Sequence, residues 1–229
     1  MSDIFEEGIR LYKTKKYQLA LEEFLSHKEK PADNPDLSYY VGLCYTKMEK
    51  YEEALLYLEN VVTLHENLFL VYQCRLILSY IYNITGRYRL AEFELEQLIE
   101  SGLESPQVYA VYGFTAYNLS KIDEGLKYLQ KALTLDPDNA NALNSIGYIM
   151  AEKEIDIASA ISYCKNAVKK RPENAAYLDS LGWAYYKDGQ LDKAKDFLSK
   201  ALNASGGHKT IALHMREVLK AGAGGNMDN

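Results

Sequence analysis

The sequence predicts an all-α fold, an array of six two-helix modules, on three observations. One pattern of residue types returns about every 34 residues along the 229-residue chain. Within each copy, apolar residues recur at three- and four-residue spacing, as on one face of a helix. Proline and glycine are concentrated at the joints between copies, where helices end. A repeat of this length is typical of stacked helix pairs that contact only their neighbours, and it argues against one closed globule.

The clearest copy of the pattern lies near the C-terminal end. Counted from the start of a unit, places 4, 7, 8, 11, 20, 24 and 27 hold Leu178, Leu181, Gly182, Tyr185, Ala194, Leu198 and Ala201. Place 8 is glycine in four further units, at Gly8, Gly42, Gly113 and Gly147. The six units therefore cover residues 1–34, 35–68, 72–105, 106–139, 140–174 and 175–208.

Packing explains why these places hold these residue types. In the fourth unit, Gly113 and Gly125 lie at places 8 and 20, and their small size lets the two predicted helices approach closely. Larger residues such as Tyr112 and Leu129 then fill the space between the helices. Pro137 ends the second helix, because proline cannot continue the backbone hydrogen bonding of a helix.

Three units depart from the pattern. The first is the most degenerate, as expected of a terminal module. In the third, the surplus residues 69–71 predict an extra helical turn at its start. Ser79 and Leu98 replace smaller residues there, which predicts a looser joint near 61–80 and a possible division of the array at 69–71. The fifth unit has one surplus residue, which we place in its inner turn at 154–156.

One further amphipathic helix is predicted at residues 209–220. Ile211, Met215 and Leu219 lie at i, i+4 and i+8, and they are flanked by Leu213 and Val218. We expect this helix to cover the exposed face of the last unit, and docking onto a partner is the alternative. Residues 221–229 have nothing to bury and are expected to be disordered.

The pattern resembles the tetratricopeptide repeat, a helix-turn-helix unit of 34 residues. The resemblance covers about nine-tenths of the chain and is most specific in the last three units, which contain LDPDNANALNSIGY and RPENAAYLDSLGWAYYKDGQLDKAKDFLSKAL. It implies that residues 1–220 form a single array of repeats and that this array is a right-handed α-α superhelix. It also implies that the first helix of each unit lines a concave groove that binds other proteins.

In this implied groove, places 5, 9 and 12 of the first helices face the partner. Place 9 is apolar in all six units and aromatic in the last four. Large side chains with a polar tip are favoured anchors at binding surfaces. The predicted partner-binding residues are Tyr39, Leu43, Tyr80, Asn83, Phe114, Tyr117, Asn144, Tyr148, Trp183 and Tyr186. Packing between neighbouring helices is the alternative reason for aromatic residues at these places.

The same groove lacks the charge pattern of the tetratricopeptide proteins that grip the acidic C-terminal tails of heat-shock chaperones. Their clamp resembles a lysine at place 5 and an asparagine at place 9, completed by further polar and basic residues in the next units. Here no unit carries lysine at place 5, and place 2 holds no basic residue. Recognition of a carboxylate needs positioned cationic donors. We therefore do not expect a chaperone tail as the partner.

Composition narrows the location and the partners. The formal net charge is −6, whereas proteins that bind nucleic acid or an anionic membrane normally show a basic surface. The N-terminal residues show no secretory signal, and the apolar stretch 68–84 is interrupted by polar residues and is no membrane span. The three cysteines follow no pairing pattern, which favours a reducing compartment. We predict a cytoplasmic protein that binds neither nucleic acid nor membrane.

No combination of residues in the sequence indicates catalysis. The glycine-rich stretch near the C-terminus follows no strand and opens no helix, so it is not a phosphate-binding loop. A zinc site needs several converging ligands, and the histidines lie without a second ligand at the required spacing. We interpret each as a surface or helix-end residue: His27, His65, His208 and His214. We expect no enzyme activity, no metal site and no cofactor.

The main functional hypothesis is a protein-interaction scaffold. It would hold an extended or helical apolar segment of a partner protein or peptide in its concave aromatic groove. The alternative is a structural subunit of a larger or self-associating assembly, which would use its ends or its convex face. Homo-oligomerisation belongs to this alternative.

Overall fold

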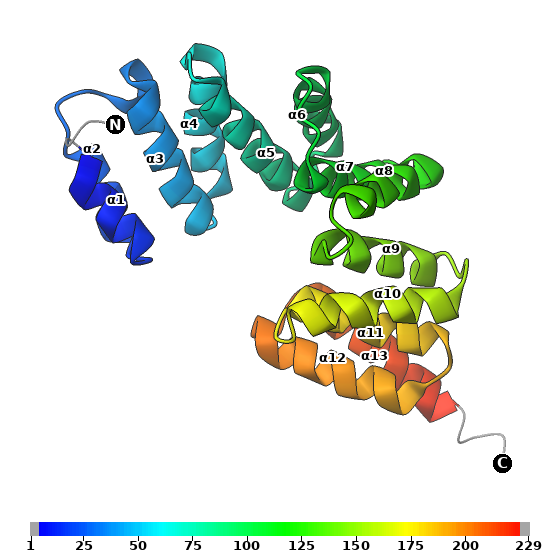
Figure 1. The fold of residues 1–229 in the computed structure, drawn as a ribbon. Helices are drawn as coiled ribbons and strands as arrows, with labels where there is room; N and C mark the ends of the chain where they lie inside the picture. Colours follow the sequence, from blue (N-terminus) through cyan, green and yellow to red (C-terminus); the bar gives the residue numbers. More distant parts are fainter. Residues whose placement is uncertain (1–4, 225–229) are drawn as a thin grey trace. The chain divides into compact units, whose positions relative to one another are not determined.

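The computed structural model describes residues 5–224, and all regular structure in that range is helical (Figure 1). The fold is the all-α solenoid of helix pairs that the repeat predicts. The chain divides into two compact units, with the division after Leu103. Within each unit every helix packs against the helix that follows it.

Unit 1 contains three helix pairs. Its helices are α1 (Glu6–Lys13), α2 (Tyr17–Leu25), the 3-10 turn η2 (Pro31–Asp33), α3 (Pro35–Lys47), α4 (Tyr51–Leu64), α5 (Leu68–Ile84) and α6 (Tyr88–Glu100). One core cluster joins α2 to α3, and a second joins α4, α5 and α6.

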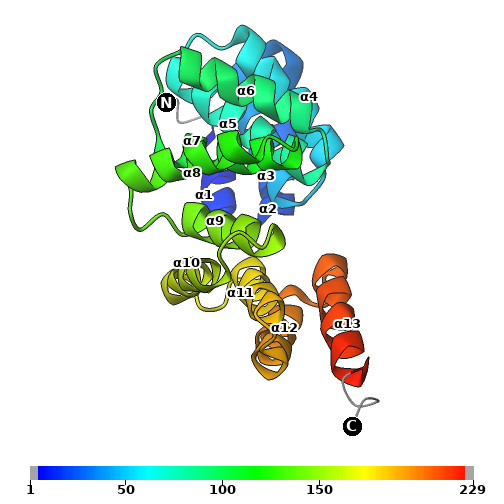
Figure 2. The ribbon, with the colours of Figure 1, turned by 90° about the vertical axis from the view of Figure 1, so that its right-hand side faces the viewer.

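Unit 2 contains three further pairs and a single last helix. Its helices are α7 (Pro106–Asn118), α8 (Ile122–Leu135), α9 (Ala140–Glu152), α10 (Ile157–Lys170), α11 (Ala175–Lys187), α12 (Leu191–Ser205) and α13 (Lys209–Gly224). A core cluster runs from α9 to α13, and Figure 2 shows α13 alongside α12.

Side-chain caps explain where the first helix of most pairs begins. An asparagine or serine at the N-cap accepts a hydrogen bond from a backbone N–H of the first turn, which would otherwise lack a partner. In α3 and α7 a proline follows the cap, at a position where its missing N–H costs nothing. The capping residues of α3, α5, α7, α9 and α11 are Asn34, Asn67, Ser105, Asn139 and Asn174.

Small residues bring the two helices of a pair together, as predicted. A Cβ atom on Gly113 would lie 2.7 Å from the carbonyl oxygen of Gly125, and one on Gly147 would lie 2.5 Å from Cys164 Sγ. In the third pair, Ser79 is fully buried, and its hydroxyl donates to the Leu76 carbonyl of the same helix at 2.8 Å. This bond satisfies the serine, so the pair closes without glycine.

The inner turns share one backbone feature. Each has a residue with positive φ, the left-handed region in which glycine is favoured. These residues are Lys15, Glu49, Gly86, Ser120, Glu154 and Gly189. The turn of the fifth pair, residues 153–156, is one residue longer than the others, which confirms the predicted insertion.

The third pair confirms one expectation and corrects another. Helix α5 has 17 residues, against 13 in α3 and α7, so the surplus residues do add a helical turn. The chain does not divide at 69–71, however, because α4 and α5 pack together and Val61 is fully buried among them. The division falls after Leu103 instead.

The last helix covers the end of unit 2, with a different apolar stripe from the one expected. Ile211 and Val218 are buried, and they lie seven residues apart. Met215, four residues after Ile211, is partly buried. Leu213 and Leu219 are exposed, which corrects the predicted stripe. The reason is geometric, since a step of seven residues returns to the same face of a helix more closely than a step of eight.

The helix also continues beyond its predicted end. Residues 221–224, expected to be disordered, form its last turn. Alanine favours helix, and Gly222 lies against Lys195 of α12. The remainder of the predicted disordered tail, 225–229, lies outside the described residues.

Candidate functional site

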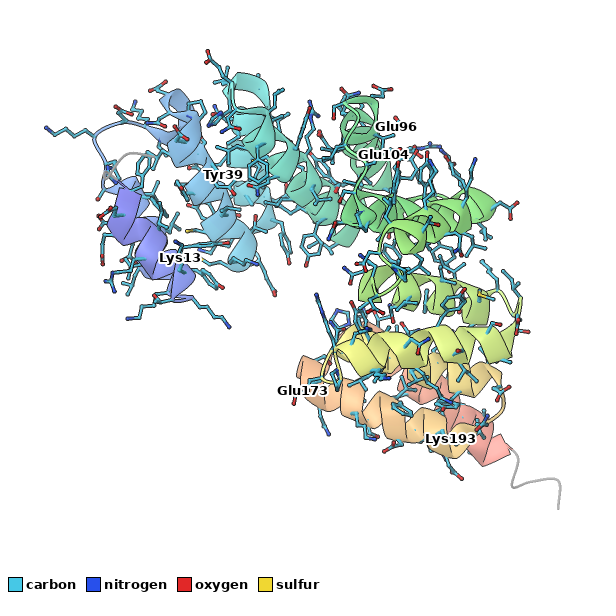
Figure 3. All side chains as sticks on the ribbon, in the orientation of Figure 1. Lys13, Tyr39, Glu96, Glu104, Glu173 and Lys193 are labelled. Atoms are coloured by element: carbon cyan, nitrogen blue, oxygen red, sulfur yellow. The ribbon has the colours of Figure 1, made fainter. Side chains whose placement is uncertain are left out.

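Polar contacts join successive first helices on the face where the partner-binding residues were predicted. In unit 1, the Tyr39 hydroxyl of α3 donates to Gln73 Oε1 of α5 at 2.8 Å (Tyr39 is labelled in Figure 3). Burial raises the pKa of Tyr39 to about 12. Tyr39 therefore holds two neighbouring helices together, which is the packing role that the sequence left open.

The other predicted residues of unit 1 differ in exposure. Tyr80 is 51% exposed and Leu43 is half-buried. Asn83 donates to the backbone carbonyl of Ser79 at 2.9 Å, one turn earlier in α5. In this unit Tyr80 is the predicted aromatic residue that is most available to a partner.

Unit 2 brings predicted residues of two adjacent first helices into contact. The Tyr117 ring of α7 meets the Tyr148 ring of α9 edge to face, with centroids 6.1 Å apart, and their side chains share a hydrogen bond. The ring centroid of Phe114 lies 6.4 Å from that of Tyr117, and Phe114 is 37% exposed. Burial raises the pKa of both tyrosines, and the nearby Glu152 carboxylate adds to the rise.

Trp183 of α11 is held on several sides. Its Nε1 donates to Glu152 Oε2 of α9 at 2.7 Å, and its ring lies 5.0 Å from the Tyr186 ring. The His214 ring of α13 stacks on the indole at 4.3 Å with an interplanar angle of 24°. The last helix therefore covers one side of the Trp183 ring.

Charged groups accompany the aromatic residues of unit 2. Asp179 Oδ1 lies 2.8 Å from His214 Nδ1, and both side chains are nearly buried. Lys187 Nζ lies 2.9 Å from Glu154, and this hydrogen bond is the largest reason that the pKa of Lys187 is raised. Glu152 accepts from the neutral indole N–H of Trp183, and its carboxylate also contributes to the raised pKa of Lys187.

Asn144 differs from the other predicted residues. It lies one helical turn before Tyr148 on α9 and is partly buried. Its Oδ1 is covered and has no hydrogen-bond donor. A buried acceptor without a donor costs roughly 1–3 kcal/mol.

The sequence interpretation missed His214 and Asp179. His214 was interpreted as a surface or helix-end residue, but its side chain is only 13% exposed. The sequence could have predicted this burial, because α13 begins where the first helix of a seventh unit would begin. His214 then lies at place 6 of that helix and can reach place 5 of the preceding one, where Asp179 lies.

The three cysteines are buried and unpaired, and burial raises the pKa of each thiol to about 12, which suppresses the reactive thiolate: Cys44, Cys74 and Cys164. No group of three potential metal ligands occurs within residues 5–224. Among the helices of residues 5–224, none combines the length and the apolar character that a membrane span requires.

Comparison with protein families points to one repeat type. Family models described as tetratricopeptide repeat match residues 36–67, 106–139 and 156–208, about half of the chain. The TPR repeat-containing protein PA4667 of Pseudomonas aeruginosa is 35% identical over 100 residues, which are 44% of this chain and 16% of that protein.

Solved structures show the same fold. A chain of the APC/C hetero-tetramer Cut9–Hcn1 aligns with a TM-score of 0.76 at 22% identity, over 96% of this chain and 41% of that one. A tetratricopeptide repeat protein from Parabacteroides merdae aligns with a TM-score of 0.74 at 15% identity, over 94% of this chain and 83% of that one. The chain thus spans less than half the length of PA4667 and of the APC/C chain. At these identities the structural likeness concerns the fold alone.

Proposed function

The chain belongs to the tetratricopeptide repeat family, and on that premise we propose that it is a protein-interaction scaffold whose unit 2 binds an apolar segment of a partner, extended or helical, on its aromatic face. By the aromatic face we mean Phe114, Tyr117, Asn144, Tyr148, Trp183 and Tyr186. A fold of stacked repeats generates extended surfaces for holding other chains.

One observation carries the proposal. The first helices α7, α9 and α11 place an aromatic series along one side of unit 2, with ring contacts from Phe114 to Tyr117 and from Tyr117 to Tyr148. Phe114 is exposed, and the others are partly buried. Side chains that already have fixed positions lose little conformational freedom on binding, so they are suited to act as anchors.

Capture of partners by a double variant tests the proposal. Phe114→Ala combined with Tyr148→Ala removes two rings from the aromatic face. The matched control, Leu135→Ala with Ile155→Ala, removes two exposed apolar side chains elsewhere in unit 2. Quantitative affinity capture with mass spectrometry should show a partner retained by wild type and control and lost from the double variant.

Folding must be excluded as the cause of any loss. Circular dichroism at 222 nm should give equal helical content for all three proteins. Since Tyr148 is partly buried, Phe114→Ser alone serves as a second variant that changes only an exposed side chain. Retention of every partner by both variants contradicts the proposal.

Exposed apolar residues of unit 1 favour a second candidate function, a subunit of a larger or self-associating assembly. Leu68 is 63% exposed and Phe69 is 66% exposed at the start of α5. Leu56 and Leu64 of α4 are exposed as well. Large exposed apolar surfaces often mark interaction sites. Light scattering should then detect an oligomer that dissociates in Leu68→Glu/Phe69→Glu, and a monomer at all concentrations contradicts self-association.

A further inference from the structure

Three large apolar side chains are exposed on α4 and α6 of unit 1. Leu56 of α4 is 69% exposed, and on α6 Leu90 and Phe93 are 49% and 53% exposed. Leu56 and Phe93 occupy the same place, 22, of the second and third repeats. In the other four repeats that place holds a polar residue: Glu22, Lys127, Ser162 and Asp196. The apolar residues therefore belong to these two repeats and are no part of the common pattern.

Contacts between α4, α5 and α6 show that the two helices bearing these side chains adjoin. At the start of both, Arg87 Nη2 lies 2.5 Å from Glu52 Oε1. Seven residues further along α4, Glu59 Oε1 accepts from the Tyr82 hydroxyl of α5 at 2.6 Å. Burial is the main reason that the pKa of Glu94 in α6 is raised, and the nearby Glu59 charge adds to the rise. Positions 52 and 59 of α4 thus lie near positions 87 and 94 of α6.

The exposed apolar side chains lie between these two points of contact. Leu56 comes four residues after Glu52, and Leu90 comes three residues after Arg87, so each shares a helix face with a contact residue. Phe93 follows Leu90 by three residues on the same face. We call Leu56, Leu90 and Phe93 the apolar patch. Exposed apolar side chains that gather on a protein surface often mark an interaction site.

Acidic residues flank the apolar patch. Residues 51–103 contain eight acidic and three basic side chains, which gives them a net charge of −5. Each arginine pairs with one acid of the same segment: Arg75 with Glu94, Arg87 with Glu52, and Arg89 with Glu92. Glu53, three residues before Leu56, is exposed. Glu96, three residues after Phe93, is exposed too (Glu96 is labelled in Figure 3). The acids around the patch therefore outnumber the bases of their own segment.

We propose that the apolar patch binds a basic amphipathic helix of a partner protein. The apolar face of such a helix would cover Leu56, Leu90 and Phe93, and its lysines or arginines would lie against the flanking glutamates. A second copy of this chain fits less well, because it would bring one acidic surface against another. The inference goes beyond the proposed function, since the patch shares no residue with the aromatic face.

Three blocked peptides of about four helical turns test the chemistry of the partner. The lysine peptide has leucines on one face and lysines on the others, and the glutamate peptide carries glutamate in place of every lysine. The scrambled peptide has the composition of the lysine peptide in an order without an apolar face. Fluorescence anisotropy measures binding at about 0.15 M salt, which screens long-range attraction. We expect the lysine peptide to bind about tenfold more tightly than either of the others.

A pair of apolar variants locates the binding site. Leu56→Ser/Phe93→Ser removes two exposed side chains of the apolar patch and should weaken binding of the lysine peptide about tenfold. The matched control, Leu135→Ser/Ile155→Ser, removes two exposed apolar side chains of unit 2. That control should bind as wild type does. Circular dichroism at 222 nm should give equal helical content for all of these proteins.

A pair of charge variants tests the role of the flanking acids. Glu53→Gln/Glu96→Gln removes two charges beside the patch and should weaken binding of the lysine peptide about threefold, since each exposed ion pair contributes little. The matched control is Glu6→Gln/Glu173→Gln, which removes the same net charge at two exposed glutamates elsewhere. The control should leave the affinity unchanged if local charge, and not the charge of the whole protein, attracts the peptide.

Four results would overturn the inference. Equal binding of the scrambled peptide would show that charge alone attracts the peptide, and equal binding of the glutamate peptide would show that no basic residues are needed. Absence of binding by the lysine peptide at about 1 mM would show that the patch is not a specific site. A dimer, detected by light scattering, that dissociates in Leu56→Ser/Phe93→Ser would make a second copy the occupant. None of these results bears on the aromatic face, which the Phe114 and Tyr148 variants test separately.

Discussion

Single residues set how closely the helices of a pair approach. Gly113 faces the backbone of α8, and a Cβ there would meet Gly125 O at 2.7 Å and Leu129 Cγ at 2.5 Å. Gly86 has φ +74° and nothing within 4 Å of the position that a Cβ would take. The two glycines thus serve different purposes, since the first is needed for space and the second for backbone conformation.

We expect Gly113→Ala to destabilise unit 2 by about 1–3 kcal/mol, because the added methyl forces two helices apart. Urea unfolding followed by circular dichroism measures this change. A free energy of unfolding equal to that of wild type would show that the pair can relax around a side chain at place 8.

Gly86→Ala should cost about 1 kcal/mol, through left-handed backbone strain alone. The control is Ser120→Gly, since Ser120 occupies the same turn position in the fourth pair with φ 64°. We expect this reverse change to leave the unfolding free energy within about 0.5 kcal/mol of wild type, as relieved strain offsets the greater freedom of the unfolded chain. Equal stability of Gly86→Ala and wild type would show that glycine is not needed for the left-handed backbone conformation at this position.

At the scale of elements, a buried ion pair joins α5 to α6. Arg75 Nη1 lies 2.6 Å from Glu94 Oε2, and the side chains are 19% and 11% exposed. Burial raises the pKa of Glu94 despite the neighbouring guanidinium. The pair is close to isolated from water, so each partner depends on the other.

Arg75→Ala should therefore destabilise unit 1 by about 3 kcal/mol at pH 7, because it leaves a buried carboxylate without a partner. Arg75→Leu/Glu94→Leu should recover most of this loss, since it removes both charges. The comparison is made by urea unfolding, and an equal loss in single and double variants would show that packing rather than charge matters.

The same pair predicts a pH dependence. A carboxyl whose folded pKa lies above its unfolded value binds its proton more tightly when folded, so its stability contribution is present at low pH and falls as pH rises through the folded pKa. In Arg75→Ala the deficit relative to wild type should shrink between pH 7 and pH 4.5. A deficit that is constant over this range would contradict the role of Glu94 ionisation.

Much of the element scale was readable from the sequence. The surplus residues 69–71 predicted the longer α5, because the 34-residue spacing fixes where each first helix must end. The division after Leu103 was not readable, since it depends on packing between whole elements rather than on any one consensus place. The site was predicted only as faces of helices. The sequence did not show which of these residues form hydrogen bonds within the protein. The Tyr39–Gln73 bond, for example, joins residues that lie 34 positions apart in the chain.

At the scale of the whole molecule, buried thiols and phenols limit stability in alkali. Burial raises the pKa of Cys44, Cys74 and Cys164 to about 12, and that of Tyr12 and Tyr39 to about 12. These groups ionise at lower pH in the unfolded chain, so stability should fall as pH rises from about 9 to about 12. Unfolding free energies measured between pH 8 and pH 11 test this, and a flat profile would contradict it.

We claim that the aromatic face of unit 2 holds the partner, and hydrogen–deuterium exchange on the protein with its captured partner tests this most directly. We predict slower exchange in α7, α9 and α11 on binding, and unchanged exchange in α2, α4 and α6. Protection confined to α2, α4 or α6, with none in α7, α9 and α11, would contradict the claim and favour assembly through unit 1.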